Sequence, residues 1–304
     1  LASRGRLSEA LEHYQALLAN RSDDPELHYN LGTALNLAGR PQDAIPHLHQ
    51  AVRQRPDHGL AHNNLGSALA DLQRLDDAAA AFEHAARLEP DFLEARDNLI
   101  NTRLKLADWR DVASLRQRLV EPALRAGPAQ PLRPFAMLGL PVAISSAEQQ
   151  RLIRAYATRE IQRAGIASIQ PYQHHVRPDP YRRLRVGYLS SDFRGHATSY
   201  LIQGLFACHD RGQMEVICYS TGVDDSSSYR QRIMQDSDAF HDLHGLGWRT
   251  VAERIHDDNI DILVDLNGFT AGDRFPALSL RPAPIQVSYL GFPGTLRSDC
   301  VDYL

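Results

Sequence analysis

The chain has 304 residues, of which 43% are hydrophobic, so it is long enough to form two domains with buried cores. Its net charge of −4, from 33 Lys and Arg against 37 Asp and Glu, lacks the basic excess that binds a phosphate backbone, which argues against nucleic acid as a partner. The absence of a membrane-length apolar run and of a leader, and three cysteines without a CxxC pair, predict a cytoplasmic protein outside the membrane.

The first 120 residues follow a 34-residue period, which is typical of tetratricopeptide repeats. In these repeats, pairs of helices stack and share a core. Small and apolar residues recur at the same offsets in two consecutive repeats: Leu31, Gly32, Ala44, Leu48, Ala51 and Pro56, then Leu65, Gly66, Ala78, Phe82, Ala85 and Pro90. We therefore expect an α-helical superhelix over residues 1–120.

Three asparagines, Asn30, Asn64 and Asn98, stand one repeat apart in the predicted first helices. Asparagine is a poor helix former, so its recurrence at one position calls for a reason. An amide offers both a donor and an acceptor, and a row of amides can hold the backbone of an extended peptide. We interpret the three as an acceptor-peptide surface; the alternative is a solvated groove that tolerates any polar residue.

Residues 121–183 are predicted to be a connector, because prolines break the repeat pattern there around one helical segment at 147–164. From residue 184 to 304, strand-like and helical runs alternate, which predicts a Rossmann-like parallel α/β domain. The predicted strands are 184–190, 215–220, 260–266 and 285–291, and the predicted helices are 198–209, 226–238 and 249–257.

Most of the polar residues that are candidates for a functional site lie in the loops that follow three of these strands. Ligands of open α/β sheets bind at the carboxyl ends of the strands, so we expect the loops at 190–199, 267–270 and 291–295 to meet there. The first loop holds Asp192 and His196, and the helix after Thr198 is expected to offer unpaired N–H groups to an anion. Taken one at a time, these residues are equally compatible with caps and turns.

No cofactor signature is present in the sequence. The dinucleotide GxGxxG and Walker patterns are absent, and none of the 14 histidines has companions at zinc-site spacing. We therefore predict no metal site.

The repeats with their asparagines, followed by LRVGYLSSDF at 184–193, RPAPIQ at 281–286 and LGFPGT at 290–295, resemble the O-linked N-acetylglucosamine transferase family, and its bacterial members in particular. The resemblance implies a GT-B glycosyltransferase that moves N-acetylglucosamine from UDP-GlcNAc to Ser or Thr hydroxyls of proteins, with inversion and without metal or cofactor. Such enzymes have two facing Rossmann-like halves. The chain is expected to hold the first half, and a C-terminal half that grips the nucleotide is expected outside it.

The resemblance also assigns residues. Asp192 matches the acid of the family's SSDFxNHPTSH motif, a candidate base, and His196 and Thr198 match residues beside the acceptor and the donor. Leu290, Gly291 and Pro293 match positions that line the sugar pocket. Three positions of the motif depart from the family: Gly195 stands for its asparagine, Ala197 for its proline and Tyr200 for its second histidine.

Two alternatives remain open at this point. A related bacterial enzyme could transfer another sugar or use an asparagine acceptor, and a non-catalytic repeat scaffold could bind peptides alone. The sequence also leaves open the acceptor protein, the oligomeric state and which of Asp192 and His196 takes the proton.

Overall fold

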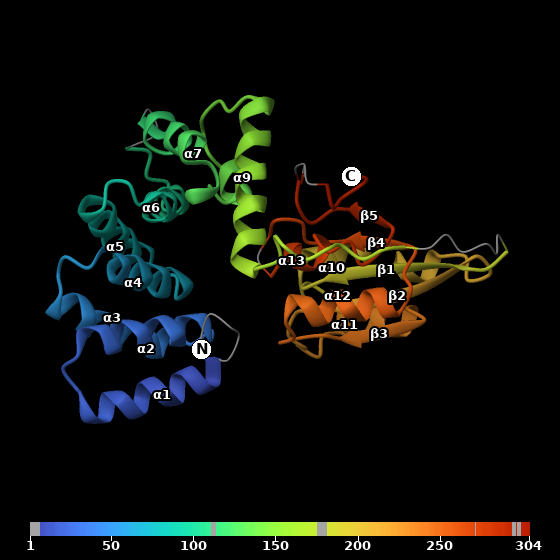
Figure 1. The fold of residues 1–304 in the computed structure, drawn as a ribbon, viewed down its shortest axis with the longest axis horizontal. Coiled ribbons are helices and arrows are strands. Elements are labelled where there is room, and N and C mark those ends of the chain that lie inside the picture. The colour runs from blue at the N-terminus through green and yellow to red at the C-terminus, as the bar shows by residue number, and fades with distance from the viewer. Residues whose placement is uncertain (1–6, 111–113, 175–180, 271, 294–295, 297–298) are drawn as a thin grey trace. The chain divides into compact units, whose positions relative to one another are not determined.

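The computed structural model describes residues 7–110, 114–174, 181–270, 272–293, 296 and 299–304, and Figure 1 shows its helices and strands. The chain forms two compact units. One, the repeat unit, comprises Leu1–Leu132 and Gly139–Ile144. The other, the α/β unit, comprises Arg133–Leu138 and Ser145–Leu304.

The repeat unit begins with α-helices joined by short turns, which lie side by side in Figure 1. They are α1 (Leu7–Asn20), α2 (Pro25–Leu37), α3 (Pro41–Gln54), α4 (Gly59–Asp71), α5 (Leu75–Leu88) and α6 (Leu93–Lys105). The predicted repeats are confirmed as the helix pairs α2–α3 and α4–α5, and the three asparagines lie on α2, α4 and α6.

In each helix pair, the two helices come into close contact at a glycine. A Cβ atom on Gly32 would lie 2.7 Å from Leu48 Cγ, and one on Gly66 would lie 2.7 Å from the Phe82 ring. The helices therefore approach more closely than a larger residue would allow. Ala44, at the start of α3, is fully buried in the same core.

The regular repeats end after α6. The repeat unit continues with η3 (Arg116–Val120), a π-helical turn, α7 (Glu121–Ala126) and η4 (Gly127–Ala129). The α/β unit begins with α8 (Pro134–Leu138) and α9 (Ser146–Ala164). Helix α9 matches the predicted segment within one residue, because a Ser145–Glu148 capping box starts it and Gly165 at φ 69° ends it.

The α/β unit has a parallel five-stranded sheet with the order β3-β2-β1-β4-β5. The strands are β1 (Leu184–Ser190), β2 (Met214–Ser220), β3 (Ala239–Asp242), β4 (Ile262–Asp265) and β5 (Ile285–Ser288). Strand order reverses beside β1, as in doubly wound sheets, whose ligands bind at that point. Four strands were predicted, and β3 was not.

Helices cover both faces of the sheet. They are α10 (Ala197–Ile202), the turn η5 (Phe206–Cys208), α11 (Ser228–Asp236), α12 (Trp248–Asp257) and α13 (Phe275–Leu278). On one face, Val186 and Val216 of the sheet pack with Phe206 of η5. On the other, Tyr219 donates a hydrogen bond to Asp258, the residue after α12.

The predicted fold class, helical repeats followed by a parallel α/β domain, is confirmed. Among the described helices, none combines the length and the apolar character needed to cross a bilayer.

Candidate active site

Asp192 is the second residue after β1, at the carboxyl edge of the sheet, and is only 6% exposed. Its own backbone N–H donates to Ser190 Oγ at 2.9 Å, while the Ser199 hydroxyl donates to its carbonyl oxygen. These contacts fix the turn between β1 and α10. The loop therefore carries a buried carboxylate whose backbone is held on both sides.

Asn267, in the loop after β4, orients this carboxylate. Its Nδ2 donates to Asp192 Oδ2 at 3.0 Å and to Ser191 Oγ at 2.9 Å, while its Oδ1 accepts the Ser191 N–H at 2.7 Å. One amide thus joins the loops after β1 and β4, which were predicted to meet. The sequence singled out its loop, but not Asn267 itself as a site residue.

His196 stands beside the Asp192 carboxylate and is more accessible to solvent. Its Nδ1 lies 3.6 Å from Asp192 Oδ2, and 41% of its side chain is exposed. On the other side, Arg194 Nη2 lies 3.6 Å from Asp192 Oδ1. The carboxylate is thus flanked by an imidazole and a guanidinium.

The imidazole of His196 also caps α10, because its Nδ1 accepts the Thr198 N–H at 3.3 Å. The N–H of Thr198 itself is therefore already bonded, while anion binding by N–H groups beyond Thr198 stays a prediction. With Nδ1 as an acceptor, a neutral imidazole carries its proton on Nε2. Thr198 itself is buried, with its Oγ1 3.2 Å from the same Nδ1.

The loop after β5 lies against the loop after β4. A Cβ atom on Gly291 would lie 1.9 Å from the Leu266 carbonyl oxygen, so only glycine fits there. Leu290 is 41% exposed and has φ 69°, a backbone conformation that an L residue adopts only at a cost. Pro293 is exposed. The predicted meeting of three loops at one edge is thus confirmed for the described residues, and residues 294 and 295 of the third loop lie outside them.

Two acids at or just beyond the end of β4 were not predicted: Asp265, which is buried, and Asp273, which is half-buried. Asp265 accepts the N–H groups of Asn267 at 3.2 Å and Gly268 at 2.8 Å, and burial raises its pKa to about 6. Burial likewise raises the pKa of Asp273 to about 7. Asp265 holds the start of the loop that carries Asn267, so the orientation of Asp192 depends on it indirectly.

The three repeat asparagines do not share one environment. Asn30 and Asn64 are half-buried, and Asn64 Nδ2 donates to Thr33 Oγ1 at 2.9 Å. Asn98 is only 8% exposed, and its Nδ2 donates to Asn63 Oδ1 at 2.9 Å. Peptide binding by this row stays a prediction, and its third member is largely withdrawn into the helix packing.

Metal ligands do not gather in the part of the chain that the structure describes. There, no group of three or more His, Cys, Asp and Glu side chains is placed to hold an ion. The absence of a metal from the reaction stays a prediction.

Comparisons with known proteins point to one family. The family described as glycosyl transferase family 41 matches residues 108–304, and tetratricopeptide repeat families match residues 1–39 and 38–91. A probable UDP-N-acetylglucosamine–peptide N-acetylglucosaminyltransferase, SEC of Arabidopsis thaliana, is 37% identical over 179 residues, 57% of this chain and 18% of the relative. A UDP-N-acetylglucosamine–peptide N-acetylglucosaminyltransferase of Caenorhabditis elegans is 44% identical over 124 residues, which are 40% of this chain and 11% of the relative.

Among solved structures, a variant of the O-GlcNAc transferase of Thermobaculum terrenum matches 99% of this chain and 51% of its own, with 26% identity and a TM-score of 0.54. The chain therefore spans about half of that transferase and less than a fifth of the two curated relatives.

Proposed function

We propose, from the premise that this chain belongs to glycosyltransferase family 41, that it provides the acceptor side of a protein O-GlcNAc transferase. The reaction is the transfer of N-acetylglucosamine from UDP-GlcNAc to Ser or Thr hydroxyls of a protein. The names of the relatives from A. thaliana and C. elegans support both the donor and the peptide acceptor. Donor binding is proposed to require a second catalytic half like the remainder of the T. terrenum transferase.

The observation that carries this proposal is the Asp192–His196 pair at the end of β1. Asp192 is buried, accepts a hydrogen bond from Asn267 and lies 3.6 Å from the His196 imidazole. The Nδ1 atom of His196 faces the Oδ2 atom of Asp192 across this distance. Both side chains can accept a proton, and they lie at the edge of the sheet where ligands bind. We therefore treat the two side chains as one unit that accepts the acceptor's proton.

The chemical step is a displacement with inversion at the anomeric carbon. The hydroxyl oxygen of Ser or Thr forms a bond to that carbon as the bond to the diphosphate oxygen breaks, and the bonding electrons leave with UDP. The hydroxyl proton passes to the Asp192–His196 unit, directly or through water. No covalent intermediate on the protein is required, and the proposal includes no metal ion.

The strained Leu290 and the closely packed Gly291 support a second role for this edge. They belong to the loop after β5, which lies beside the loop that holds Asn267. We propose that this loop, with Pro293, forms part of the wall of the sugar pocket. Thr198 is proposed to lie beside the donor, with its hydroxyl on the same side as the His196 imidazole.

The test is transfer of radiolabelled GlcNAc from UDP-GlcNAc to a serine peptide by the protein that contains this chain. Label on the serine peptide, none on the same peptide with alanine, and unchanged activity in EDTA are expected. The anomeric proton in the NMR spectrum of the product reports inversion. Label on an asparagine peptide alone, or label only from another sugar nucleotide, would replace this proposal with the corresponding alternative transferase. Peptide binding without any transfer would favour the non-catalytic scaffold.

A further inference from the structure

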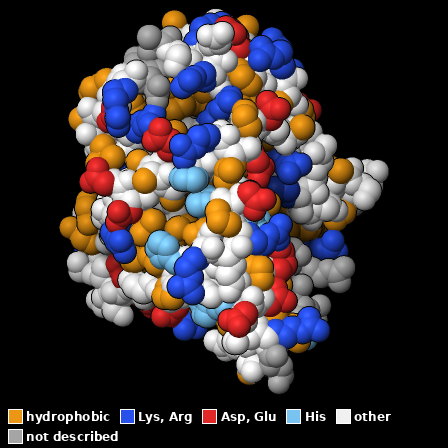
Figure 2. Space-filling view, turned by 90° about the vertical axis from the view of Figure 1, so that its left-hand side faces the viewer, with side chains coloured by type: hydrophobic (Ala, Val, Ile, Leu, Met, Phe, Trp, Pro, Cys, Tyr) orange, Lys and Arg blue, Asp and Glu red, His pale blue; other side chains and the backbone are white. Residues whose placement is uncertain are grey.

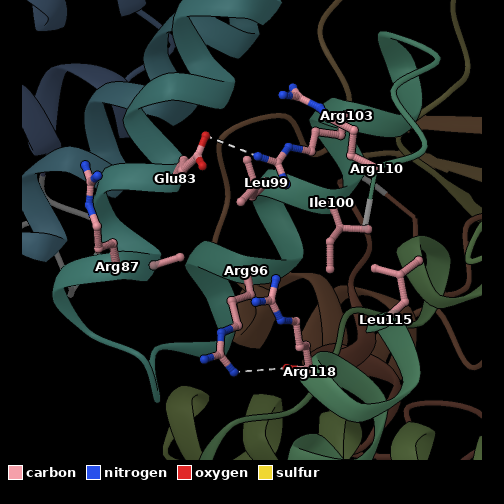
Figure 3. A pocket seen from close by; sticks show the side chains of 10 residues that line it. Glu83, Arg87, Arg96, Leu99, Ile100, Arg103, Arg110, Leu115 and Arg118 are labelled. Atoms are coloured by element: carbon pink, nitrogen blue, oxygen red, sulfur yellow. Dashed lines mark hydrogen bonds and ion pairs between the residues drawn. The ribbon is translucent and has the colours of Figure 1, made fainter. Parts of the chain in front are cut away.

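A cavity of about 400 Å³ lies within the repeat unit, among residues of α5 and α6 together with Arg110, Leu115 and, in η3, Arg118. Figure 3 shows its lining side chains, half of which are cationic. Five arginines face it with a single acid, Glu83, and the arginines are Arg87, Arg96, Arg103, Arg110 and Arg118. Figure 2 shows several Lys and Arg side chains, with hydrophobic ones among them, gathered on the upper part of one face.

Two residues that line the cavity depart from the pattern of the earlier repeats. The glycine at position 66, which lets Phe82 approach within contact, is replaced one repeat later by Ile100. The buried Leu69 is replaced at the same offset by Arg103, which is 9% exposed. At these two positions the third repeat thus carries a larger apolar side chain and a guanidinium in place of a glycine and a leucine.

The acids near this cavity balance only some of its charge. Arg103 pairs with Glu83 at 3.1 Å and with Asp108 at 3.7 Å. Arg96 donates to the Arg118 carbonyl oxygen at 3.0 Å. Among the residues that the structure describes, no carboxylate pairs with Arg87 or Arg96. The cavity therefore presents guanidinium groups suited to the planar, two-oxygen geometry of carboxylates and phosphates.

The rest of the lining is apolar. Leu99, Ile100 and Leu115 contribute to the wall. A wall of this kind has no favourable contact to offer an inorganic anion, but it suits an aliphatic side chain carried between anionic groups. Stacked repeats also present extended surfaces that take peptides.

We propose that this cavity binds an acidic peptide segment of a partner protein, with an aliphatic side chain against Leu99, Ile100 and Leu115 and flanking carboxylates on Arg87 and Arg96. This site lies apart from the Asp192 loop in the sequence and requires no sugar transfer. It therefore goes beyond the proposed function, and its test is a binding measurement that succeeds or fails whether or not the protein transfers a sugar.

The experiment measures fluorescence anisotropy of a labelled peptide, Asp-Glu-Leu-Glu-Asp, on the full chain. Arg87→Glu and Arg96→Glu are each expected to weaken binding at least about tenfold, because each places a negative charge opposite a peptide carboxylate. The matched control is Arg53→Glu. Arg53 occupies the same offset one repeat earlier, is exposed in the last turn of α3 and lies outside the cavity lining, so binding should change less than about twofold. Circular dichroism verifies that all variants are folded.

Two further arms identify the ligand class. A peptide with serine in place of leucine should bind at least about fivefold more weakly if the apolar wall takes part. Sodium pyrophosphate should not displace the peptide at equal concentration. Absence of binding, equal weakening by Arg53→Glu, no effect of the leucine, or displacement by equimolar pyrophosphate would each overturn the proposal, the last in favour of a small-anion site.

Discussion

The regular repeats and the carboxyl edge of the sheet bury different kinds of side chain. In the regular repeats the helix interfaces consist mainly of alanine, leucine and phenylalanine, as at Ala44, Leu48 and Phe82. At one edge of the α/β unit, by contrast, buried polar residues gather at the ends of neighbouring strands: Ser190, Ser191, Asp192, Asp265 and Asn267.

The two kinds of buried side chain have different roles, the apolar ones in stability and the polar ones in chemistry. Burying apolar side chains stabilises a fold without fixing any reactive group, whereas a buried polar group has a cost unless it is fully hydrogen-bonded. The network around Asp192 meets that requirement through Asn267, Ser191 and Ser190. We therefore expect substitutions at the strand ends to change activity, and substitutions between repeat helices to change stability.

The largest expected effect is that of Asp192→Asn on turnover. Loss of a general base commonly reduces rates by about 10² to 10⁴-fold, and we expect a reduction in this range in the protein that contains this chain. The amide has the same shape and can still bond to its neighbours, so the melting temperature should change little. Turnover equal to wild type would remove Asp192 from the reacting centre, and a large fall in melting temperature would assign it a structural role.

The next effect concerns pH and Asp265. Its pKa is raised from 3.8 to about 6 on folding, so the native state favours the protonated form. The contribution of Asp265 to the free energy of unfolding is therefore fully present below about pH 4 and is lost as pH rises through 6. A shift of this size corresponds to at most about 3 kcal/mol.

Urea unfolding of wild type and Asp265→Asn between pH 4.5 and 8 measures this contribution, because titrations common to both proteins cancel in the difference. Wild type should lose stability relative to the variant as pH rises. A difference in unfolding free energy that does not vary with pH would show that Asp265 titrates normally.

A core substitution in the repeats should act on stability alone. Gly66→Ala places a Cβ atom 2.7 Å from the buried Phe82 ring, and overpacking of this kind costs about 1–3 kcal/mol. Gly204→Ala is the control, because no atom lies within 4 Å of the added Cβ. Thermal unfolding should separate the two variants, and the transfer rate at low temperature should be unchanged in both. Equal melting temperatures would contradict the close helix approach.

The smallest expected effects distinguish Asn64 from Asn98. Asn64→Ala removes a half-buried amide and should weaken acceptor-peptide binding by a few-fold, about 1 kcal/mol, at unchanged helicity. Asn98→Ala leaves Asn63 Oδ1 without its buried donor, so it should instead reduce stability by about 1–3 kcal/mol. Calorimetric peptide titration and thermal unfolding measure the two. The reverse assignment would place Asn98 in the binding surface.

Much of the fold could be predicted because its signals are local. The 34-residue period gives the helix pairs, and the strand-like run at 184–190 gives β1 with its observed limits. Strand β3 could not be recognised, because two of the residues of Ala239–Asp242 are polar and none of the four is fully buried. The predicted helix at 198–209 is divided into α10 and η5, and its composition gives no indication of this break.

The location of the site could be predicted from the sequence, but the contacts within it could not. Loops after parallel strands meet at one edge, so Asp192 and His196 could be located there from the sequence. The role of Asn267 depends on a contact between residues 75 positions apart, and periodicity carries no information about it. The bond from Thr198 N–H to His196 depends likewise on the turn that precedes α10.

The central claim is that Asp192 and His196 act as one unit at the reacting centre, and a double-mutant cycle on turnover tests it most directly. Groups that act together are strongly non-additive, so the double variant Asp192→Asn/His196→Ala should be no slower than the slower of the two single variants. All three should be far slower than wild type while melting at similar temperatures. A double variant whose loss equals the product of the two single losses, or single variants with wild-type turnover, would contradict the account.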